Sequence, residues 1–351
     1  MEEKPSVPRQ GAVDLAKALA ICAVLLIHCG TDHYTLHPIG SLPWLAADFY
    51  GGVTRWAVPV FLMCSGALMN DPDRVLPLKK LFSRYLLRLL AALAAWSVFY
   101  ELLGIAVALG GDASLGELVG RALENLFYGK TFYHLYYFYF AFSLYLALPL
   151  TRLVARRGAE GEVRYLLALW MLFGGVFPFL QYFWPLREMT SSLLYFVLPM
   201  AFLCPGLGLL GWYMRSHPPR GWRAGAALFA AGFGVTFLGT WWRSAHYGVY
   251  DRLFLTGFGP FVLLMAAGVF RLCQWASARW NRPPRPVQLL SAASFCVYLI
   301  HPFFQSLTVR TPLAALPPWW GIPLHGAVLL ALSLAAYLVI RRIPVVNRWL
   351  I

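Results

Sequence analysis

The amino-acid sequence predicts an all-α fold, a polytopic bundle of about ten transmembrane helices with both termini in the cytoplasm. The 351 residues are 60% hydrophobic and only 13% charged, and the mean hydropathy is +0.61. A soluble domain carries about 25% charged residues, so a water-soluble globule of this composition would expose too much apolar surface. Ten spans of about 20 residues leave no room for a sizeable soluble domain. Residues 1–351 are therefore expected to form a single transmembrane domain.

Ten apolar runs, each bounded by charged residues, Pro or Gly, predict the individual helices. They cover residues 13–30, 53–69, 82–109, 132–150, 165–184, 191–213, 224–242, 253–274, 288–309 and 322–340. The first run has no basic segment directly before it and no Ala-x-Ala site, so we expect a retained helix rather than a cleaved signal peptide.

The distribution of basic residues predicts the orientation. With the N-terminus in the cytoplasm, 22 of the 29 Lys and Arg residues fall on the cytoplasmic side and seven on the outer side, which is the asymmetry that short loops show in membrane proteins. The formal net charge of +14 is then explained by topology. The expected partners include membrane lipid and exclude nucleic acid, and a homo-oligomer is left open.

Polar residues in the first helix form one stripe. Lys17 and His28 are eleven residues apart, so they lie within about 20° of the same helix face and about 16 Å apart along the axis, and Asp14 shares that face. One interpretation is that Asp14 and Lys17 pair at the interface while His28 reaches outward. The other is that the stripe faces a cavity in which His28 accepts a proton, because its ordinary pKa is near neutral.

The next two helices carry candidate donor-binding residues. Pro59 and the Ser65–Gly66 pair are expected to interrupt the second helix, with Ser65 either at a functional site or simply at a helix contact. Lys80, Arg84 and Arg88 follow at intervals of four and share one face of an α-helix. Guanidinium groups are suited to phosphate, so these residues predict a site for a cytoplasmic phosphorylated cofactor.

Further polar residues occur in later helices. Glu101 is an intramembrane charge that we expect to pair across helices with a His or an Arg. His134 precedes an aromatic run and is either an interfacial anchor or a functional group. Tyr298 and His301 share a face, and His301 is either a packing residue or part of a site.

The predicted outer loops are rich in His, Tyr, Trp and Gly and also contain Arg55 and Arg243. Their aromatic residues are interpreted either as interfacial anchors or as carbohydrate contacts. The six Cys residues lie in or beside apolar runs without a Cys-x-x-Cys pair, so they are interpreted as small buried hydrophobic residues, and no metal site is expected.

In order and spacing, these fragments resemble the acyltransferase 3 family of integral-membrane, acyl-CoA-dependent O-acyltransferases, in particular members that O-acetylate polysaccharides. The resemblance covers essentially the whole chain. It is carried by Asp14, Lys17 and His28, by VPVFLMCSG from Val58 to Gly66, by the basic start of the third helix, by HLYY from His134 and by SFCVYLIHP from Ser294 to Pro302.

The resemblance implies an enzyme of the bacterial cytoplasmic membrane that uses acyl-CoA, in the simplest case acetyl-CoA, as co-substrate and a glycan or lipid-linked sugar as acceptor. It implies that Lys17 and His28 are required for transfer, with Asp14 beside Lys17 and with His28 as general base or transient acyl carrier. Here Lys17 stands where the family usually has Arg, which removes a forked donor but keeps the charge.

The remaining site residues are assigned on the hypothesis of such a transfer. The donor side comprises Ser65, Lys80, Arg84 and Arg88, and the acceptor side comprises Arg55, Glu101, His134, Arg243, Tyr298 and His301. The alternative from another class is a multi-pass exporter of small organic acids or sugars, which would use the polar stripe as a permeation path without acyl transfer.

Overall fold

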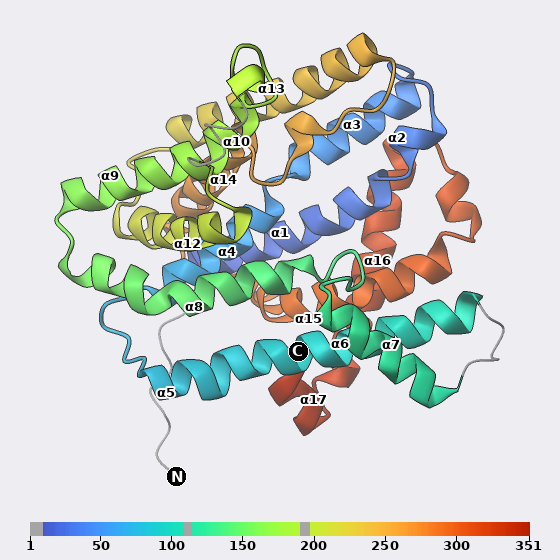
Figure 1. Ribbon diagram of the computed structural model, residues 1–351, viewed down its shortest axis with the longest axis horizontal. Helices are drawn as coiled ribbons and strands as arrows, with labels where there is room; N and C mark the ends of the chain where they lie inside the picture. The colour runs from blue at the N-terminus through green and yellow to red at the C-terminus, as the bar shows by residue number, and fades with distance from the viewer. Residues whose placement is uncertain (1–9, 109–113, 190–196) are drawn as a thin grey trace.

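The protein is an all-helical bundle (Figure 1). The computed structural model describes residues 10–108, 114–189 and 197–351, and these contain no β-strand. The main helices are α1 (Gly11–Gly30), α3 (Leu42–Thr54), α4 (Ala57–Met69), α6 (Leu87–Ala108), α8 (Tyr136–Arg157), α9 (Glu160–Met171), α12 (Met200–Ser216), α13 (Arg223–Tyr247), α14 (Pro260–Ser277), α15 (Arg285–Thr308) and α16 (Pro318–Ile340). Shorter elements are α2 (His33–Leu36), α5 (Leu78–Lys80), η1 (Leu81–Leu86), α7 (Leu115–Phe127), η2 (Leu172–Val176), α10 (Phe177–Leu180), η3 (Leu186–Met189), η5 (Leu253–Leu255), η6 (Pro312–Ala315) and α17 (Pro344–Trp349).

Within the described residues, nine helical segments are long and apolar enough to cross a membrane. They correspond to nine of the ten predicted spans, which confirms the polytopic helical bundle. The predicted span at 191–213 coincides with α12, which has 17 residues. Residues 191–196 of this span lie outside the described residues, and the cytoplasmic location of the termini stays a prediction.

Two segments predicted as outer loops contain helices instead. Residues before the predicted second span form α3, which begins with Ser41 as N-cap and Pro43 in its first turn. Because α3 and α4 are separated only by Arg55 and Trp56, the second span is longer than its apolar run. The other helix is α7, which begins at a capping box formed by Ser114 and Glu117. Polar helix caps and amphipathic patterns are weaker signals than a continuous apolar run.

The predicted second span is interrupted at Arg55 and Trp56, just before Pro59, but its helix continues without a break through Ser65 and Gly66. Pro59 lies in the first turn of α4, where a missing N–H costs no intrahelical hydrogen bond. Gly66 is required by packing, because a Cβ built on it would overlap the backbone of Gly208 in α12. A Cβ on Gly211 would likewise overlap the Met63 carbonyl. The glycines therefore bring α4 and α12 into backbone contact, as small residues do between membrane helices.

Helix α1 lies in the middle of the bundle and packs against α3, α4, α14, α15 and α16 (Figure 1). Its small and branched residues, such as Ala16, Ala20, Ile21 and Val24, are almost completely buried. A helix surrounded on most sides cannot turn polar groups toward lipid, so the stripe that contains Lys17 must face another helix or a cavity.

The loop after α4 is held by arginines from α8. The guanidinium of Arg152, which is 6% exposed, donates hydrogen bonds to the carbonyls of Met69 and Arg74. Arg156 donates to the carbonyl of Pro72 at 2.8 Å. In the sequence, these two arginines count only toward the charge asymmetry between the two sides of the membrane. In the structure, both hold the loop after α4 by hydrogen bonds.

A third arginine holds the same loop from α12. Arg215 donates to the carbonyl of Ala67 at 2.6 Å and to the Asp71 carboxylate at 2.8 Å. Burial alone would raise the pKa of Asp71, but hydrogen bonds from Arg215 and from the Asp73 amide outweigh it and leave the pKa lowered. Asp71 is therefore ionised at neutral pH, and the loop is fixed between α4, α8 and α12.

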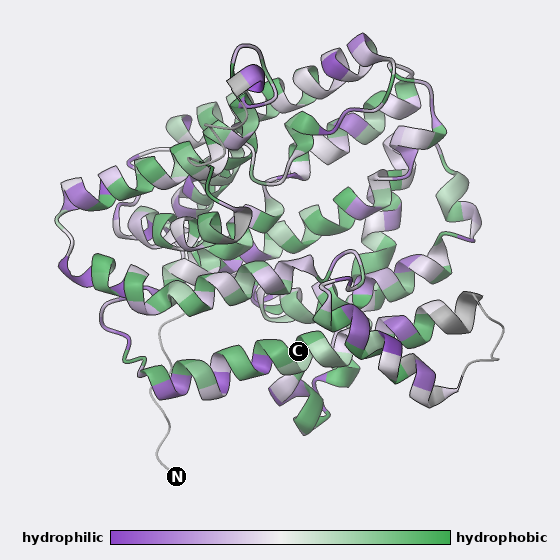
Figure 2. Ribbon diagram, viewed as in Figure 1, coloured by the Kyte–Doolittle hydropathy of each residue, from purple (hydrophilic) through white to green (hydrophobic). Residues whose placement is uncertain are grey.

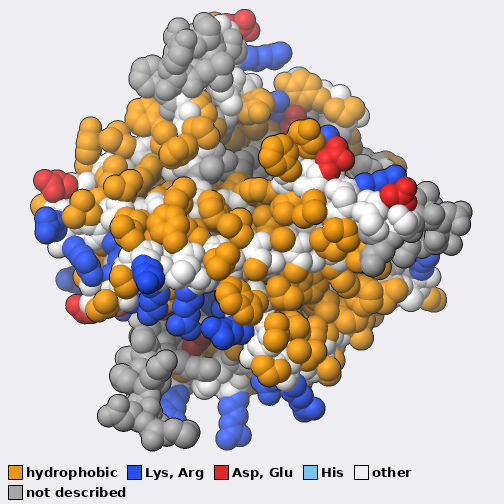
Figure 3. Space-filling model, turned by 60° about the horizontal axis from the view of Figure 1, so that its bottom comes forward, with side chains coloured by type: hydrophobic (Ala, Val, Ile, Leu, Met, Phe, Trp, Pro, Cys, Tyr) orange, Lys and Arg blue, Asp and Glu red, His pale blue; other side chains and the backbone are white. Residues whose placement is uncertain are grey.

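The surface is consistent with a membrane protein. Hydrophobic residues run along most of the helices, and hydrophilic residues are concentrated in connections and helix ends (Figure 2). On the face shown in Figure 3, hydrophobic side chains form a broad band, and Lys and Arg side chains gather along one edge of it. Exposed large hydrophobic residues such as Leu90, Phe202, Leu238, Trp320 and Val339 suit contact with lipid.

Substitution of Gly66 tests the contact between α4 and α12. We expect Gly66→Ala to lower the Tm of the detergent-solubilised protein by about 5 °C or more, because the added methyl group meets backbone that cannot rotate away. The matched control is Gly234→Ala in α13, where nothing lies within 4 Å of the added Cβ. Equal Tm values for both variants would contradict the assigned contact.

Candidate functional site

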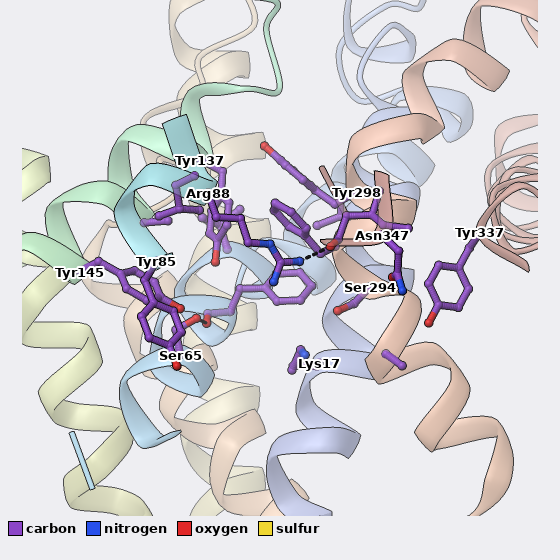
Figure 4. Close-up of a pocket in the computed structure, with 18 residues that line it drawn as sticks. Lys17, Ser65, Tyr85, Arg88, Tyr137, Tyr145, Ser294, Tyr298, Tyr337 and Asn347 are labelled. Atoms are coloured by element: carbon purple, nitrogen blue, oxygen red, sulfur yellow. Dashed lines mark hydrogen bonds between the residues drawn. The ribbon is translucent and has the colours of Figure 1, made fainter. Parts of the chain in front are cut away.

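A cavity of about 540 Å³ lies between α1, α4, η1, α6, α8, α15, α16 and the chain around α17. Figure 4 shows its polar side chains arranged around one space, with Tyr85 and Tyr145 on one side and Tyr337 and Asn347 on the other. Its size falls in the range of about 300–1,000 Å³ that small-molecule sites occupy. The lining residues are Lys17, Val24, Val58, Phe61, Ser65, Tyr85, Arg88, Leu89, Tyr137, Ala141, Tyr145, Ala292, Ser294, Phe295, Tyr298, Tyr337, Asn347 and Ile351.

The N-terminal part of the predicted stripe on α1, at Asp14, is hydrogen-bonded to α15. Ser291 donates a hydrogen bond of 2.5 Å to one oxygen of the Asp14 carboxylate, and the other oxygen is buried without a hydrogen-bond partner among the described residues. Lys17, one turn further along α1, lines the cavity. Asp14 therefore fixes the position of α1 against α15, and Lys17 supplies a cation to the cavity.

Arg88 is the second cation of the cavity, and it contacts the last residues of the chain. Its guanidinium donates a hydrogen bond to the main-chain oxygen of Ile351 (Figure 4). Trp96, on the same helix, donates to the main-chain oxygen of Leu350 at 3.1 Å. The segment around α17 thus covers one side of the cavity and occupies a hydrogen-bonding direction of Arg88.

The other two basic residues predicted for this site lie elsewhere. Lys80 and Arg84 are exposed and do not line the cavity. Between Lys80 and Arg88 lies η1, a π-helical segment at Leu81–Leu86 that the predicted α-helical spacing does not include. Of the three basic residues, only Arg88 lines the cavity.

Four tyrosines that line the cavity, Tyr85, Tyr137, Tyr145 and Tyr337, are not among the residues predicted for the site. Tyr85 and Tyr145 stack with ring centroids 6.0 Å apart, and Tyr137 completes the aromatic part of the lining. Tyr137 and Tyr145 occur in the aromatic run that follows His134. Nothing in the pattern distinguishes an inward-facing tyrosine from one at the bilayer interface. Ser65, which was predicted, lines the cavity while its hydroxyl donates to the Phe61 carbonyl.

Three histidines that the sequence treats separately converge in the interior. His28 of α1 and His301 of α15 have ring centroids 5.0 Å apart. His134, just before α8, lies 5.6 Å from His301. His134 and His301 are fully buried, and the ring of His28 also packs against Tyr133 at 5.2 Å. We refer to His28, His134 and His301 as the histidine cluster.

Tyr298 separates the cavity from the histidine cluster. Its side chain lines the cavity, while its ring lies 5.5 Å from that of His134 and 6.2 Å from that of His301. Its hydroxyl donates to the main-chain oxygen of His134. Since Val24 also lines the cavity, His28 lies one helical turn beyond the cavity along α1.

The main chain of His28 is held from α15. The side-chain amide of Gln305 donates to the His28 carbonyl at 3.0 Å, and its oxygen accepts from the Tyr133 hydroxyl at 3.3 Å. These two bonds connect α1, α15 and the segment before α8. They fix the backbone on which His28 is carried.

The remaining predicted acceptor residues are dispersed. The Glu101 carboxylate accepts from Asn125 of α7 at 3.2 Å, so its observed partner is neither His nor Arg. Arg243 donates to Asp251 at 2.7 Å. Neither Glu101 nor Arg243 lines the cavity. Arg55 interacts electrostatically with His28, which places it near the histidine cluster.

The arrangement combines two chemical capabilities. The cavity offers two cations, Lys17 and Arg88, among aromatic and hydroxyl groups, which suits an anionic, elongated ligand. The histidine cluster beyond Tyr298 offers three imidazoles in a buried setting, and imidazole nitrogens can accept and donate protons. A ligand in the cavity would therefore present its inner end to acid–base groups.

Comparison with protein families gives one finding. The family model described as "Acyltransferase domain" matches residues 10–341, nearly the whole chain. No curated protein and no solved structure matches the chain.

Removal of the Ser291 hydroxyl tests the anchor of the predicted stripe. We expect Ser291→Ala to lower the Tm by about 2–4 °C, because a partly buried carboxylate loses its observed donor. The control is Ser306→Ala, whose exposed hydroxyl bonds only within its own helix. If the Ser291 and Ser306 variants have the same Tm, the bond from Ser291 to Asp14 does not stabilise the protein.

Proposed function

Because this chain belongs to the acyltransferase 3 family of membrane acyltransferases, we propose that it transfers an acyl group from cytoplasmic acyl-CoA to a hydroxyl of an extracytoplasmic glycan or lipid-linked sugar. The simplest donor is acetyl-CoA. The chain is a multi-pass membrane protein, and we propose the bacterial cytoplasmic membrane as its location. Family membership favours transfer over the alternative of an exporter.

One observation carries this proposal: the cationic cavity ends at Tyr298, and the histidine cluster begins on the other side of the same residue. A thioester arm that enters beside Lys17 and Arg88 would bring its acyl carbon toward His28. An acceptor hydroxyl that arrives from the opposite side, near Arg55, would reach the same histidines. The two substrates would thus meet within one bundle.

The reaction requires one proton to move between substrates. His28 would accept the proton of the acceptor hydroxyl while the oxygen attacks the acyl carbon. The new C–O bond forms, the C–S bond breaks, and the proton passes to the thiolate of the leaving CoA. In the other version left open by the sequence, His28 first carries the acyl group, and the hydroxyl attacks that intermediate.

Of the residues on the donor side, Arg88 has the largest proposed role in binding the donor. In this structure Arg88 bonds the Ile351 main-chain oxygen, so anionic groups of the donor would replace that oxygen as its hydrogen-bond acceptor. Lys17 contributes a point charge without the forked geometry of Arg. Lys80 and Arg84, exposed beside the cavity, would act on the donor only by long-range attraction.

Binding of CoA tests the donor site. We expect Arg88→Gln to weaken the binding of CoA by about tenfold, because a charge-assisted contact is replaced by a neutral one. The measurement is a saturable shift of Tm with added CoA. The control is Arg223→Gln, at an exposed position at the start of α13, which should bind CoA like the wild type. Equal affinity of the Arg88 variant and the wild type would remove Arg88 from the donor site.

Replacement of His28 tests the chemical step. We expect His28→Ala to reduce acyl transfer by at least about 100-fold while CoA binding is kept, since His28 does not line the cavity. The assay follows radiolabelled acetyl groups from acetyl-CoA into membranes of cells that lack the gene. Full transfer by the variant would exclude His28 as base and as acyl carrier.

A further inference from the structure

The sequence His301-Pro302 lies inside α15, where a proline changes the hydrogen bonding of the helix. Pro302 has no N–H, so the carbonyl of Tyr298, four residues earlier, receives no bond from the helix backbone. A carbonyl that is buried in a membrane protein needs another donor. Nδ1 of His301 lies 2.8 Å from the Tyr298 oxygen and 3.2 Å from the Val297 oxygen.

A side chain also replaces the missing backbone donor at a second proline within a helix. Pro323 in α16 removes the backbone donor to the Trp319 carbonyl, and that oxygen accepts from the Tyr50 hydroxyl at 3.0 Å. A side chain therefore replaces the missing amide in both helices. At Pro302 the replacement is a titratable ring, so the local bond has a chemical consequence.

The consequence is a fixed tautomer. A carbonyl oxygen only accepts, so Nδ1 of His301 must carry the hydrogen, and in the neutral ring Nε2 then carries the lone pair. Nε2 is buried and has no hydrogen-bond partner among the described residues. It belongs to a ring whose nearest ionisable neighbours are His28 of α1 at 5.0 Å and His134 at 5.6 Å.

We propose that Pro302 is a positioning residue for the transfer reaction: it keeps His301 in the Nδ1–H form, so that Nε2 is available to accept a hydrogen bond from protonated His28. The inference rests on the proposed function for the role of His28. It deepens that function, because it assigns how the basic group is supported. No carboxylate is needed for this support.

In the reaction, His28 takes the proton of the acceptor hydroxyl and becomes an imidazolium. The N–H of His28 that does not face the substrate is then offered to Nε2 of His301, which stabilises the charge without taking the proton. When the thiolate leaves, His28 returns the substrate's proton to sulfur and both rings are neutral again. This division of work between a base and the group that orients it is the logic of the Ser-His-Asp triad.

Kinetics with three variants tests the proposal. Pro302→Ala restores an amide donor to the Tyr298 carbonyl and releases His301. His301→Asn keeps a short side-chain N–H donor near that carbonyl but removes Nε2. We expect each to lower kcat by at least about tenfold with the KM for acetyl-CoA unchanged. The double variant should be no slower than His301→Asn alone, because Pro302 acts only through His301.

The matched control is Pro323→Ala, which makes the same backbone exchange in α16, where the freed carbonyl is bonded by Tyr50 and not by a histidine. It should keep the wild-type kcat. Additive losses in the double variant, or an unchanged kcat in Pro302→Ala, would overturn the proposal. A fall in kcat for Pro323→Ala equal to that for Pro302→Ala would also overturn it, because the loss of a proline from a helix would then cause the effect without His301.

A spectroscopic measurement separates this inference from the proposed function. In protein with ¹⁵N-labelled histidine, the signals lost in His301→Asn identify His301, and their shifts report which ring nitrogen carries hydrogen. We expect the Nδ1–H form in the wild type and a mixture of both forms in Pro302→Ala. The Nε2–H form in the wild type would refute the fixed tautomer, whatever the activity. If the tautomer is confirmed but no acetyl transfer is detected, the proposed function fails instead.

Discussion

The lack of water in the hydrocarbon region is the constraint on which the rest of this structure depends. Each polar group that folds into the bundle must find its partner inside the protein or remain unsatisfied at a cost. The Asp14 carboxylate meets Ser291 of another helix, and the carbonyl freed by Pro302 meets His301. Such bonds connect helices that apolar packing alone would leave free to rotate, because lipid and leucine attract each other about as well as two leucines do.

Backbone contact sets the positions of the helices, and these bonds set their rotation. The glycines of α4 and α12 bring two helices close together, and arginines from α8 and α12 fix the loop that follows α4. The cavity lies beside this fixed corner, lined by Ser65 of α4 and by Tyr137 and Tyr145 of α8. Helices that are fixed in this way give a suitable support for a site, since their side chains keep the cavity open.

The sequence predicts the helices and one face of one helix correctly, for a physical reason. Apolar length and the spacing of Lys17 and His28 are properties of a single helix, and a single helix has known geometry. The convergence of His28, His134 and His301 depends on how three separate segments pack and rotate, which the spacing within each does not encode. The basic residues of the third span show the same limit, because a spacing of four predicts a shared face, yet Arg84 is exposed while Arg88 lines the cavity.

The position of Tyr298 between cavity and histidines bears on how transfer would avoid hydrolysis. A thioester beside an active base is attacked by any water that reaches it, so the base and the donor should share only a narrow, dry contact. Tyr298 provides such a boundary: its ring lies against two of the histidines, and its hydroxyl hydrogen is donated to the His134 main chain and not to water. On the proposed reaction, an acceptor hydroxyl bound among the histidines would be the nucleophile closest to the acyl carbon. Selectivity for a sugar over water would then come from the packing around Tyr298, and only in second place from recognition of the sugar itself.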